Sequence, residues 1–281
     1  AMVRTILFLL QLLVLKLLDV RLVWTVHNIV NHERRFVIWE LFVSRLLARI
    51  VDALIVHCDS AIPIVTENFK ITTRTVHVIP HGHYIDAYPA CDGSQVEPRY
   101  LDMAKLDCVY LYFGQIREYK GLERLVRVFA TVEQKDVTLV IAGQPKSERL
   151  RRRLLDAAGK DARLSLHLEH IDNKALAHLL SIADIVVLPY ENVLTSGSAI
   201  LAGSFGRPLI VPYTGCLKDF APEGAIHFDP MSDRSLKYAL ETAAAAPLET
   251  MGDEARKYVQ QASWPVVAAK TVETYHAVCN R

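Results

Sequence analysis

The sequence predicts an α/β protein with two domains, each built on a parallel sheet. A length of 281 residues suits about two domains. With 51% hydrophobic and 22% charged residues, the chain has the composition of a globular protein. Short apolar runs alternate with segments of helical periodicity along most of the chain, and such alternation is typical of parallel sheets with helices on both faces.

The N-terminal part predicts a β-α-β-α-β unit preceded by an apolar helix. That helix covers residues 5–18, and because Gln11 and Lys16 interrupt it we expect a packed amphipathic helix rather than a membrane span. Strands are predicted at 21–26, 53–58 and 75–82, and helices at 36–50 and 61–69. We assign residues 1–88 to this N-terminal domain and residues 89–106, which lack periodicity, to a linker.

The C-terminal part predicts a second, more regular domain over residues 107–262, followed by a helix at 263–281 that packs back on the first domain. Its six apolar strands are expected at 108–114, 137–143, 164–169, 184–190, 208–213 and 225–229. Strands that alternate with helices in this way form a doubly wound sheet. Ligands of such sheets bind at the carboxyl ends of the strands.

Composition and missing motifs exclude several classes of function. Lysine and arginine (32) balance aspartate and glutamate (31), so nothing indicates a nucleic-acid partner. No GxGxxG or GxxxxGK[ST] follows a strand, which argues against nicotinamide enzymes and P-loop nucleotidases. No D-x-D pair is present to hold a divalent metal, so no metal ligands and no resident cofactor are predicted. Five cysteines without a CxxC pair fit a reducing, cytoplasmic setting.

Two loops after strands carry groups that bind phosphate. The first, "FGQIREYKG", contains Gly114, Arg117 and Lys120, whose two cations can neutralise a diphosphate. A solvated loop in which Arg117 pairs with Glu118 or Glu123 is the alternative.

The second loop precedes a helix of small residues. Thr195, Ser196, Gly197 and Ser198 offer hydroxyls and free backbone N–H groups, which favour an anion at a helix N-terminus. Both loops follow strands of one sheet, so we expect them to serve one diphosphate-containing ligand.

These loops, together with "LVIAGQP", "IADIVVLPYE", "TSGSAIL" and "FGRPLIV", resemble the retaining, family-4-like glycosyltransferases of the GT-B fold, which has two Rossmann-like domains. The resemblance covers about residues 20 to 280. It implies metal-independent transfer of a hexose from a UDP- or GDP-sugar bound mainly by the C-terminal domain. By analogy, Arg117 and Lys120 hold the diphosphate beside Gly114, Ser196 to Ser198 contact phosphate or sugar, and Ile171 lies in the loop that contacts the base.

The family's pair of glutamates, spaced E-x7-E, is not intact in this chain. Glu191 stands near the first position, but Ala199 follows eight residues later, and alignment on the Gly206-Arg207-Pro208 turn places Leu201 at the second position. Because the second glutamate holds the donor ribose in the family, recognition of ribose and base and the retaining outcome do not carry over.

Histidines in N-terminal loops are candidates for a base or hydrogen-bond partner of an acceptor hydroxyl, because the histidine pKa lies nearest to neutral pH. The candidates are His27, His32, His81 and His83. We prefer His27, which directly follows a strand and matches the cleft histidine of the family, and we take His27 and Glu191 as the catalytic pair. Histidines within strands are expected to be structural, namely His57, His77, His167 and His227.

The resemblance implies a carbohydrate or lipid-linked acceptor and a role in bacterial surface polysaccharide synthesis at the inner face of the plasma membrane. The arginines around helix 36–50 fit either peripheral membrane contact or simple solvation.

Fewer than 100 residues precede the linker, whereas about 150–200 are expected of a complete domain. We therefore expect an incomplete N-terminal domain that pairs with a second copy or a partner chain. A partner-dependent nucleotide-sugar-binding subunit and a sugar-phosphate isomerase of the epimerase type are the alternatives.

Overall fold

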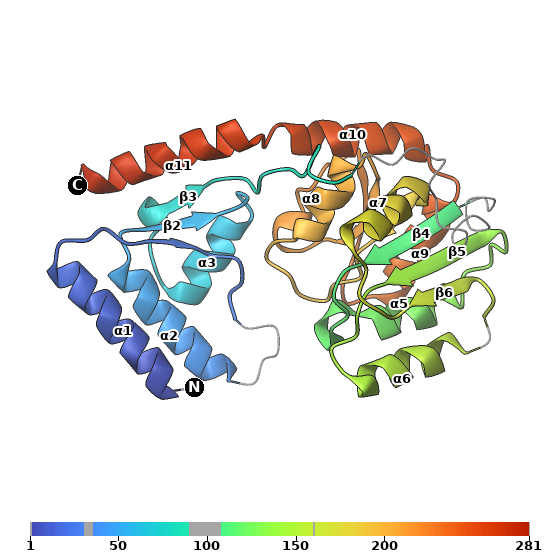
Figure 1. The fold of residues 1–281 in the computed structure, drawn as a ribbon, viewed down its shortest axis with the longest axis horizontal. Coiled ribbons are helices and arrows are strands. Elements are labelled where there is room, and N and C mark those ends of the chain that lie inside the picture. Colours follow the sequence, from blue (N-terminus) through green and yellow to red (C-terminus); the bar gives the residue numbers. More distant parts are fainter. Residues whose placement is uncertain (1, 31–35, 90–107, 160, 281) are drawn as a thin grey trace. The chain divides into compact units, whose positions relative to one another are not determined.

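The computed structural model describes residues 2–30, 36–89, 108–159 and 161–280 (Figure 1). The chain divides into two compact units. The first comprises residues 1–81 and 264–281, and the second comprises residues 82–263. The linker expected at 89–106 lies almost entirely outside the described residues. Each unit is an α/β structure with its own parallel sheet.

The first unit contains a three-stranded parallel sheet. It is formed by β1 (Val23–Thr25), β2 (Ala53–Val56) and β3 (Val76–Val78), in that spatial order. All four residues of β2 are buried, whereas β1 and β3 are half-buried. The continuous apolar run of β2 follows from its central place, because a central strand of a covered parallel sheet is buried on both faces.

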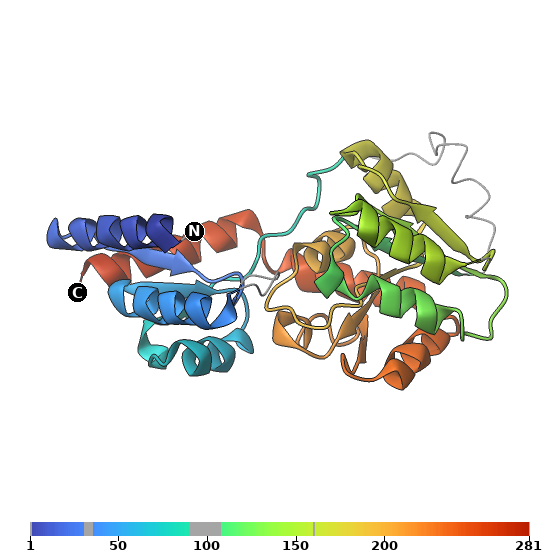
Figure 2. The ribbon, with the colours of Figure 1, turned by 90° about the horizontal axis from the view of Figure 1, so that it is seen from below.

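Among its described residues, this unit has the α-helices α1 (Met2–Leu17), α2 (Val37–Ile50), α3 (Ala61–Phe69) and α11 (Trp264–Cys279). The helices α2 and α3 cover one face of the sheet and α11 lies on the other (Figures 1 and 2). A short 3₁₀ turn at Thr73–Thr75 leads into β3. Trp24 of β1 stacks on Phe69 of α3, with ring centroids 5.1 Å apart.

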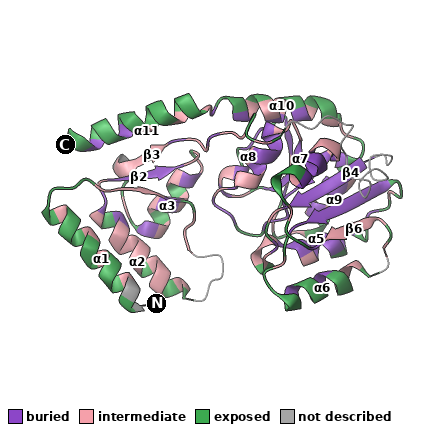
Figure 3. Cartoon of the chain, in the orientation of Figure 1, coloured by how far each residue is buried: buried purple, intermediate pink, exposed green. Residues whose placement is uncertain are grey.

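Helix α1 packs through a narrow face only. Lys16 reaches from it to Asp52 with N–O distances of 2.8 Å, and α1 also contacts α2. The rest of the helix is exposed although it is strongly apolar, which Figure 3 shows as a largely green ribbon. The exposed apolar residues of α1 are Val3, Ile6, Leu7, Phe8, Leu10, Leu13, Val14, Leu15 and Leu17. The expected packed helix is therefore present but only partly covered. None of the described helices combines the length and the hydropathy needed to cross a membrane.

The second unit contains a six-stranded parallel sheet with the spatial order β6-β5-β4-β7-β8-β9. Its strands are β4 (Cys108–Phe113), β5 (Val137–Ala142), β6 (Leu164–His167), β7 (Ile185–Val187), β8 (Leu209–Pro212) and β9 (Ala225–Phe228). The sequence runs outward from β4 to one edge, returns to β7 beside β4, and then runs to the other edge. This is the predicted doubly wound order, with its switch point between β4 and β7.

Helices cover both faces of this sheet (Figure 1). On one face, α5 (Leu122–Phe129) contacts α6 (Glu148–Ala158) and α9 (Asp233–Ala243). On the other, α7 (Asn173–Ile182) packs on β4, and α8 (Gly197–Ser204) packs on α10 (Leu248–Gln260). Every residue of β4 and β5 is buried, so the main hydrophobic core of the chain lies in this unit, visible as the purple sheet of Figure 3.

Candidate functional site

The candidate site of the second unit lies at its topological switch point. Strand β4 ends at Phe113 and is followed by Gly114, while the neighbouring β7 leads through Leu188 and Pro189 into the loop before α8. Because the two strands are adjacent and parallel, the loops that follow them meet at one edge of the sheet. A doubly wound sheet binds its ligand in this crevice.

Gly121 holds the loop after β4 against the end of β7. Its φ of +69° is left-handed, and a Cβ atom there would stand 2.2 Å from the carbonyl oxygen of Pro189. Only glycine tolerates both the conformation and the close approach. Gly121 also ends the 3₁₀ turn Glu118–Lys120 and precedes α5, so it fixes the position of Lys120 relative to the second loop.

Gly114 keeps a space open between the two loops. A Cβ atom on Gly114, whose φ is +109°, would stand 3.7 Å from Lys120 Nζ and 3.9 Å from Ser198 Oγ. These are ordinary van der Waals distances, so a group resting over Gly114 would meet both an ammonium and a hydroxyl. The structure thus brings together three of the predicted site residues: Lys120 and Ser198 on two sides of the crevice, and Gly114 between them.

Lys120 occupies an aromatic and largely buried setting. Its Nζ lies 5.7 Å from the ring centroid of Tyr112 and 5.4 Å from that of Tyr190, which places the cation near two π systems. Burial and, to a smaller extent, the nearby Arg117 cation together lower the pKa of Lys120 to about 8. An anion bound at this position would stabilise the charged form of Lys120, which burial and Arg117 disfavour. A perturbed pKa in a crevice is typical of functional sites.

The N-terminus of α8 forms the other side of the crevice. Ser196 caps the helix by accepting a hydrogen bond from the Ala199 amide at 3.3 Å. The side chains of Ser196 and Ser198 also hydrogen-bond to that of Tyr190, whose pKa burial raises to about 12 against the opposing effect of these bonds. The hydroxyl-rich loop is therefore tied to the tyrosine that lies beside Lys120.

Arg117 lies in the loop after β4, directly before the 3₁₀ turn Glu118–Lys120, and is half-buried. It donates to the Gln115 side-chain oxygen from Nε at 3.2 Å and from Nη2 at 2.8 Å. Glu118 and Glu123, the carboxylates considered as its partners, both pair with Arg153, at 2.7 Å and 3.2 Å. Arg117 thus lies in the same loop as Lys120, and the side-chain amide of Gln115 orients its guanidinium group.

The other predicted donor-side residues occupy the same edge of the sheet. Thr195 is half-buried beside the Ser196 cap, and the exposed Glu191 lies next to the Gly121 turn, where an added Cβ would stand 3.9 Å from Glu191 Cγ. Ile171 lies in the loop between β6 and α7 and packs against the core. Ala199, which stands eight residues after Glu191, is fully buried inside α8.

Two charged residues of the quoted motifs make structural hydrogen bonds, one to strand β4 and one to helix α7. Asp184 accepts a 2.7 Å hydrogen bond from the Val109 amide, and Arg207 donates to the Ser181 carbonyl at 3.0 Å. In both motifs, "IADIVVLPYE" and "FGRPLIV", a charged residue therefore has a structural role.

Three histidines gather at the carboxyl ends of the three strands of the first unit. His27 follows β1, His57 follows β2 and His81 follows β3. His57 Nε2 and His27 Nδ1 are 3.4 Å apart, and the rings of His57 and His81 lie 5.7 Å apart. The other ring nitrogen of His57, Nδ1, is 2.9 Å from the Ile79 carbonyl oxygen. Burial lowers the pKa of His57, the Ile79 bond opposes this shift, and His27 and His81 add to it.

The other histidines considered in the sequence lie in a loop or within strands. His83 Nδ1 accepts from the Ile85 amide at 3.3 Å, which is a local loop contact. His77, His167 and His227 lie within β3, β6 and β9, as expected. His57 was expected in a strand but lies one residue beyond β2, so the structural role assigned to it from sequence is incomplete. His32 falls outside the described residues.

In the part of the chain that the structure describes, no group of three or more histidines, cysteines, aspartates or glutamates could hold a metal ion. The sequence profile of the family described as glycosyl transferases group 1 matches residues 101–262, which include every donor-side residue named above. The chain belongs to this family.

Curated and solved relatives agree with this assignment. A GDP-mannose:glycolipid 4-beta-D-mannosyltransferase of Xanthomonas campestris pv. campestris is 30% identical over 274 residues, covering 95% of this chain and 71% of its own length. Sucrose-phosphate synthase of Thermosynechococcus elongatus superposes with a TM-score of 0.77 at 22% identity, over 93% of this chain and 68% of its own. HepE of Anabaena, solved in complex with UDP, superposes with a TM-score of 0.80 at 17% identity, over 95% of this chain and 75% of its own.

The chain is therefore a glycosyltransferase of the GT-B fold, a hexosyltransferase that uses a nucleotide-sugar donor. Three features of its candidate sites were not found from the sequence. Tyr112 and Tyr190, which lie beside Lys120, looked like ordinary core residues of strands. His57 was assigned to a strand because the sequence does not show that β2 ends at Val56.

Proposed function

We propose that this glycosyltransferase transfers mannose from GDP-mannose to a glycolipid acceptor and forms a 4-β-linked product, as a step in bacterial surface polysaccharide synthesis. The observation that carries the proposal is the 30% identity to the Xanthomonas mannosyltransferase over 95% of this chain, which includes both units. The UDP complex of HepE supports only the shared fold, because that protein is 17% identical.

The donor diphosphate is proposed to lie over Gly114, between Lys120 and the N-terminus of α8. In the reaction the bond between the sugar C1 and the diphosphate oxygen breaks, and the acceptor hydroxyl oxygen bonds to C1 while losing its proton. The leaving GDP gathers negative charge. Lys120 and Arg117 are placed in one loop to stabilise that charge, and Ser198 adds a hydroxyl donor. Two cations of this kind can take the place of a metal ion.

On the acceptor side, His27 is proposed to receive the proton of the acceptor hydroxyl. It is exposed, it follows β1, and His57 lies 3.4 Å from its ring nitrogen. His57 in turn is positioned by the Ile79 carbonyl, so the pair has a defined orientation. Because Ala199 replaces the second glutamate of the family pattern, the retaining outcome of the family is not assumed for this chain.

A donor panel tests this proposal. Purified protein is incubated with a bacterial glycolipid extract and GDP-mannose, UDP-glucose or UDP-N-acetylglucosamine, and lipid products are measured by mass spectrometry. A mass increase of one hexose with GDP-mannose alone, and a β-mannosidic signal in the NMR spectrum of the product, are expected. Transfer from a UDP-sugar instead would refute the donor assignment. Binding of GDP without transfer in any mixture would favour the partner-dependent binding subunit.

A further inference from the structure

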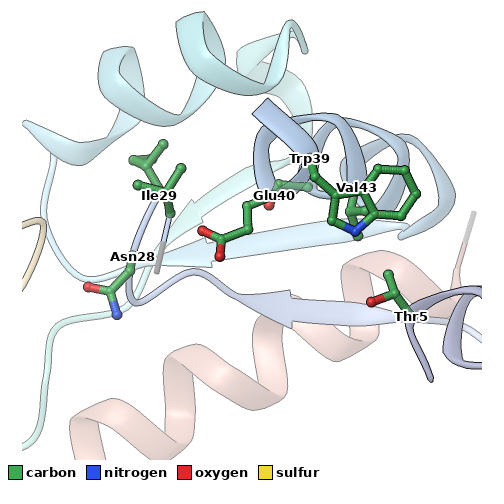
Figure 4. Close-up of a pocket in the computed structure, with 8 residues that line it drawn as sticks. Thr5, Asn28, Ile29, Trp39, Glu40 and Val43 are labelled. Carbon is green, nitrogen blue, oxygen red and sulfur yellow. The ribbon is translucent and has the colours of Figure 1, made fainter. Parts of the chain in front are cut away.

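A pocket of about 340 Å³ lies in the first unit, between α1, the loop after β1 and the first turns of α2 (Figure 4). Trp39 and Glu40 are among the residues that line it. Another lining residue, Val30, is followed directly by residues 31–35, which the structure does not describe, so we assign no ligand to this pocket. The crevice over Gly114 in the second unit is instead formed by described residues.

Tyr190 connects the two sides of that crevice. Only 3% of its surface is exposed. Lys120 Nζ lies 5.4 Å from the centroid of its ring. The side chain of Tyr190 also hydrogen-bonds to those of Ser196 and Ser198 at the N-terminus of α8. One buried side chain therefore contacts both the cation and the hydroxyls that are proposed to hold the diphosphate.

The main chain around Tyr190 is rigidly placed. The Leu188 amide, two residues earlier, donates to the Ile210 carbonyl of β8 at 2.9 Å. The Pro189 carbonyl oxygen lies so close to Gly121 that a Cβ atom added there would stand 2.2 Å from it. Tyr190 thus extends from a fixed point of the sheet. A residue that orients its neighbours requires such a support.

The hydroxyls around Tyr190 can form a directed chain of hydrogen bonds. Each hydroxyl has one proton to donate and can also accept. The Ala199 amide can only donate, and it donates to Ser196 Oγ at 3.3 Å. The Ser196 proton is then available to Tyr190, the Tyr190 proton to Ser198, and the Ser198 proton to a ligand. Hydrogen bonds ordered in this way polarise and strengthen one another.

The surroundings of Ser198 Oγ indicate what would lie at the end of this chain. A Cβ atom on Gly114 would stand 3.9 Å from Ser198 Oγ and 3.7 Å from Lys120 Nζ. An ammonium group only donates hydrogen bonds, and an ionised phosphate oxygen only accepts them. A phosphate over Gly114 would therefore need the Ser198 proton. A Ser198 hydroxyl that donates to Tyr190 has no proton left for the phosphate, so Tyr190 must donate to Ser198.

We propose that Tyr190 is a positioning residue of the donor site: its hydroxyl donates to Ser198 and thereby directs the Ser198 proton to the diphosphate, while its ring holds the Lys120 ammonium on the other side. This inference rests on the proposed function only in placing the diphosphate over Gly114. The sugar, the base and the acceptor do not enter it. Because Tyr190 is buried, it acts through its neighbours and does not touch the donor.

Calorimetric titration with GDP and with UDP tests the hydroxyl chain in a double-mutant cycle at constant pH. Tyr190→Phe keeps the ring beside Lys120 and removes only the hydroxyl, and Ser198→Ala removes the last donor of the chain. We expect each single substitution to raise the Kd about 5- to 10-fold, the usual effect of losing one hydrogen bond. The double variant should bind about as weakly as Ser198→Ala alone, because the Tyr190 hydroxyl acts only through Ser198.

Tyr110→Phe is the matched control. Tyr110 is a buried tyrosine of the same sheet, and its hydroxyl donates to the Leu240 carbonyl at 2.7 Å. The substitution removes the same group outside the chain, so the Kd should stay within about twofold of the wild type. Thermal unfolding shows whether each variant is folded. In ³¹P NMR spectra of the bound nucleotide, a diphosphate resonance should move alike in Tyr190→Phe and Ser198→Ala and keep its wild-type position in Tyr110→Phe.

Ser196→Gly serves as a second variant if Tyr190→Phe does not fold. It interrupts the chain at its first hydroxyl, and glycine is a tolerated N-cap residue. The Kd should rise about twofold or more, since the Tyr190 hydroxyl loses the donor that orders it. Unchanged affinity in folded Ser196→Gly protein would overturn the chain.

The outcomes separate this inference from the proposed function. Additive losses in the double variant, or wild-type affinity in Tyr190→Phe while Ser198→Ala binds weakly, would overturn the role of Tyr190 and leave the diphosphate site in place. Wild-type affinity in both Ser198→Ala and Lys120→Met would overturn the site and the inference together, as would binding of neither nucleotide. The expected coupling with UDP but not with GDP would support the role of Tyr190 and refute GDP-mannose as the donor.

Discussion

Raising the pH from 7 to 9 is expected to weaken the binding of GDP to this glycosyltransferase, because the charge of Lys120 is lost in that interval. The pKa of Lys120 falls from 10.5 to about 8 through burial first and Arg117 second. A pKa lowered this far corresponds to a penalty of about 3 kcal/mol on the charged form. The free protein thus holds a strained ammonium next to the open space over Gly114.

The magnitude follows from the protonated fraction of Lys120. With a pKa of about 8, roughly nine-tenths of the side chains are charged at pH 7 and roughly one-tenth at pH 9. If only the ammonium form binds the diphosphate, the apparent Kd for GDP should rise about tenfold over these two pH units. The last ionisation of a terminal phosphate has a pKa of about 6 and is nearly complete at pH 7, so the small remaining change would favour binding at higher pH and oppose the predicted decline.

Isothermal titration calorimetry across this pH range is the assay, with two substitutions as references. Lys120→Arg keeps a positive charge at every pH and should give a nearly flat profile. Lys120→Met should bind GDP about 10- to 150-fold more weakly at pH 7, as expected for the loss of a charge-assisted contact of about 1.5–3 kcal/mol. A flat profile in the wild type, or the same decline in Lys120→Arg, would refute the role of Lys120.

The same shift predicts the opposite trend for stability. Because the pKa of Lys120 is lower in the folded state than in the unfolded state, the unfolded chain binds more protons between about pH 8 and 10.5. The contribution of Lys120 to the free energy of unfolding should therefore rise with pH across that window. Urea unfolding of wild type and Lys120→Met would measure it as a difference. A contribution that falls over the same window would contradict the lowered pKa.

Three further predictions concern the same account. Arg117→Ala should weaken GDP binding about tenfold or more in calorimetry without lowering the melting temperature, because Arg117 lies in a loop and its hydrogen bonds to Gln115 are local; unchanged affinity would remove it from the diphosphate site. Transfer should continue in EDTA, since two cations are proposed to replace a metal, and rescue of a chelated enzyme by manganese or magnesium would show that this is wrong. The exposed apolar face of α1 should drive self-association or pairing with a partner chain through the first 60 or so residues, so light scattering should show oligomers that dissociate on dilution, whereas a monomer at every concentration would contradict it.

The sequence predicts the second unit closely because its signals are strong and mutually consistent. Each predicted strand overlaps an observed one, and the predicted runs exceed the observed strands mostly at their ends, as at 184–190 against Ile185–Val187. Periodicity locates a buried strand well but leaves its last residues uncertain. The loops after β4 and β7 were predicted to lie at one edge, and Gly114, Lys120 and Ser198 do converge there.

What the sequence could not supply is the packing around those residues. In the sequence, Tyr112 and Tyr190 look like core residues of two predicted strands, and their place beside the Lys120 cation depends on the turn that Gly121 makes. His57 was placed in a strand because "ALIVHC" is apolar to its end, whereas β2 stops at Val56. The pocket beside Trp39 combines α1, a loop and α2, and no pattern within one segment reveals a cavity made by three.

The central claim is that the donor diphosphate lies over Gly114, and a crystal structure of the protein with GDP would test it most directly. The account predicts phosphate oxygens within hydrogen-bond distance of both Lys120 Nζ and Ser198 Oγ, the two atoms that an added Gly114 Cβ would approach at 3.7 Å and 3.9 Å. A diphosphate bound elsewhere on the sheet edge, with Lys120 still held between Tyr112 and Tyr190 and no phosphate near it, would contradict the account.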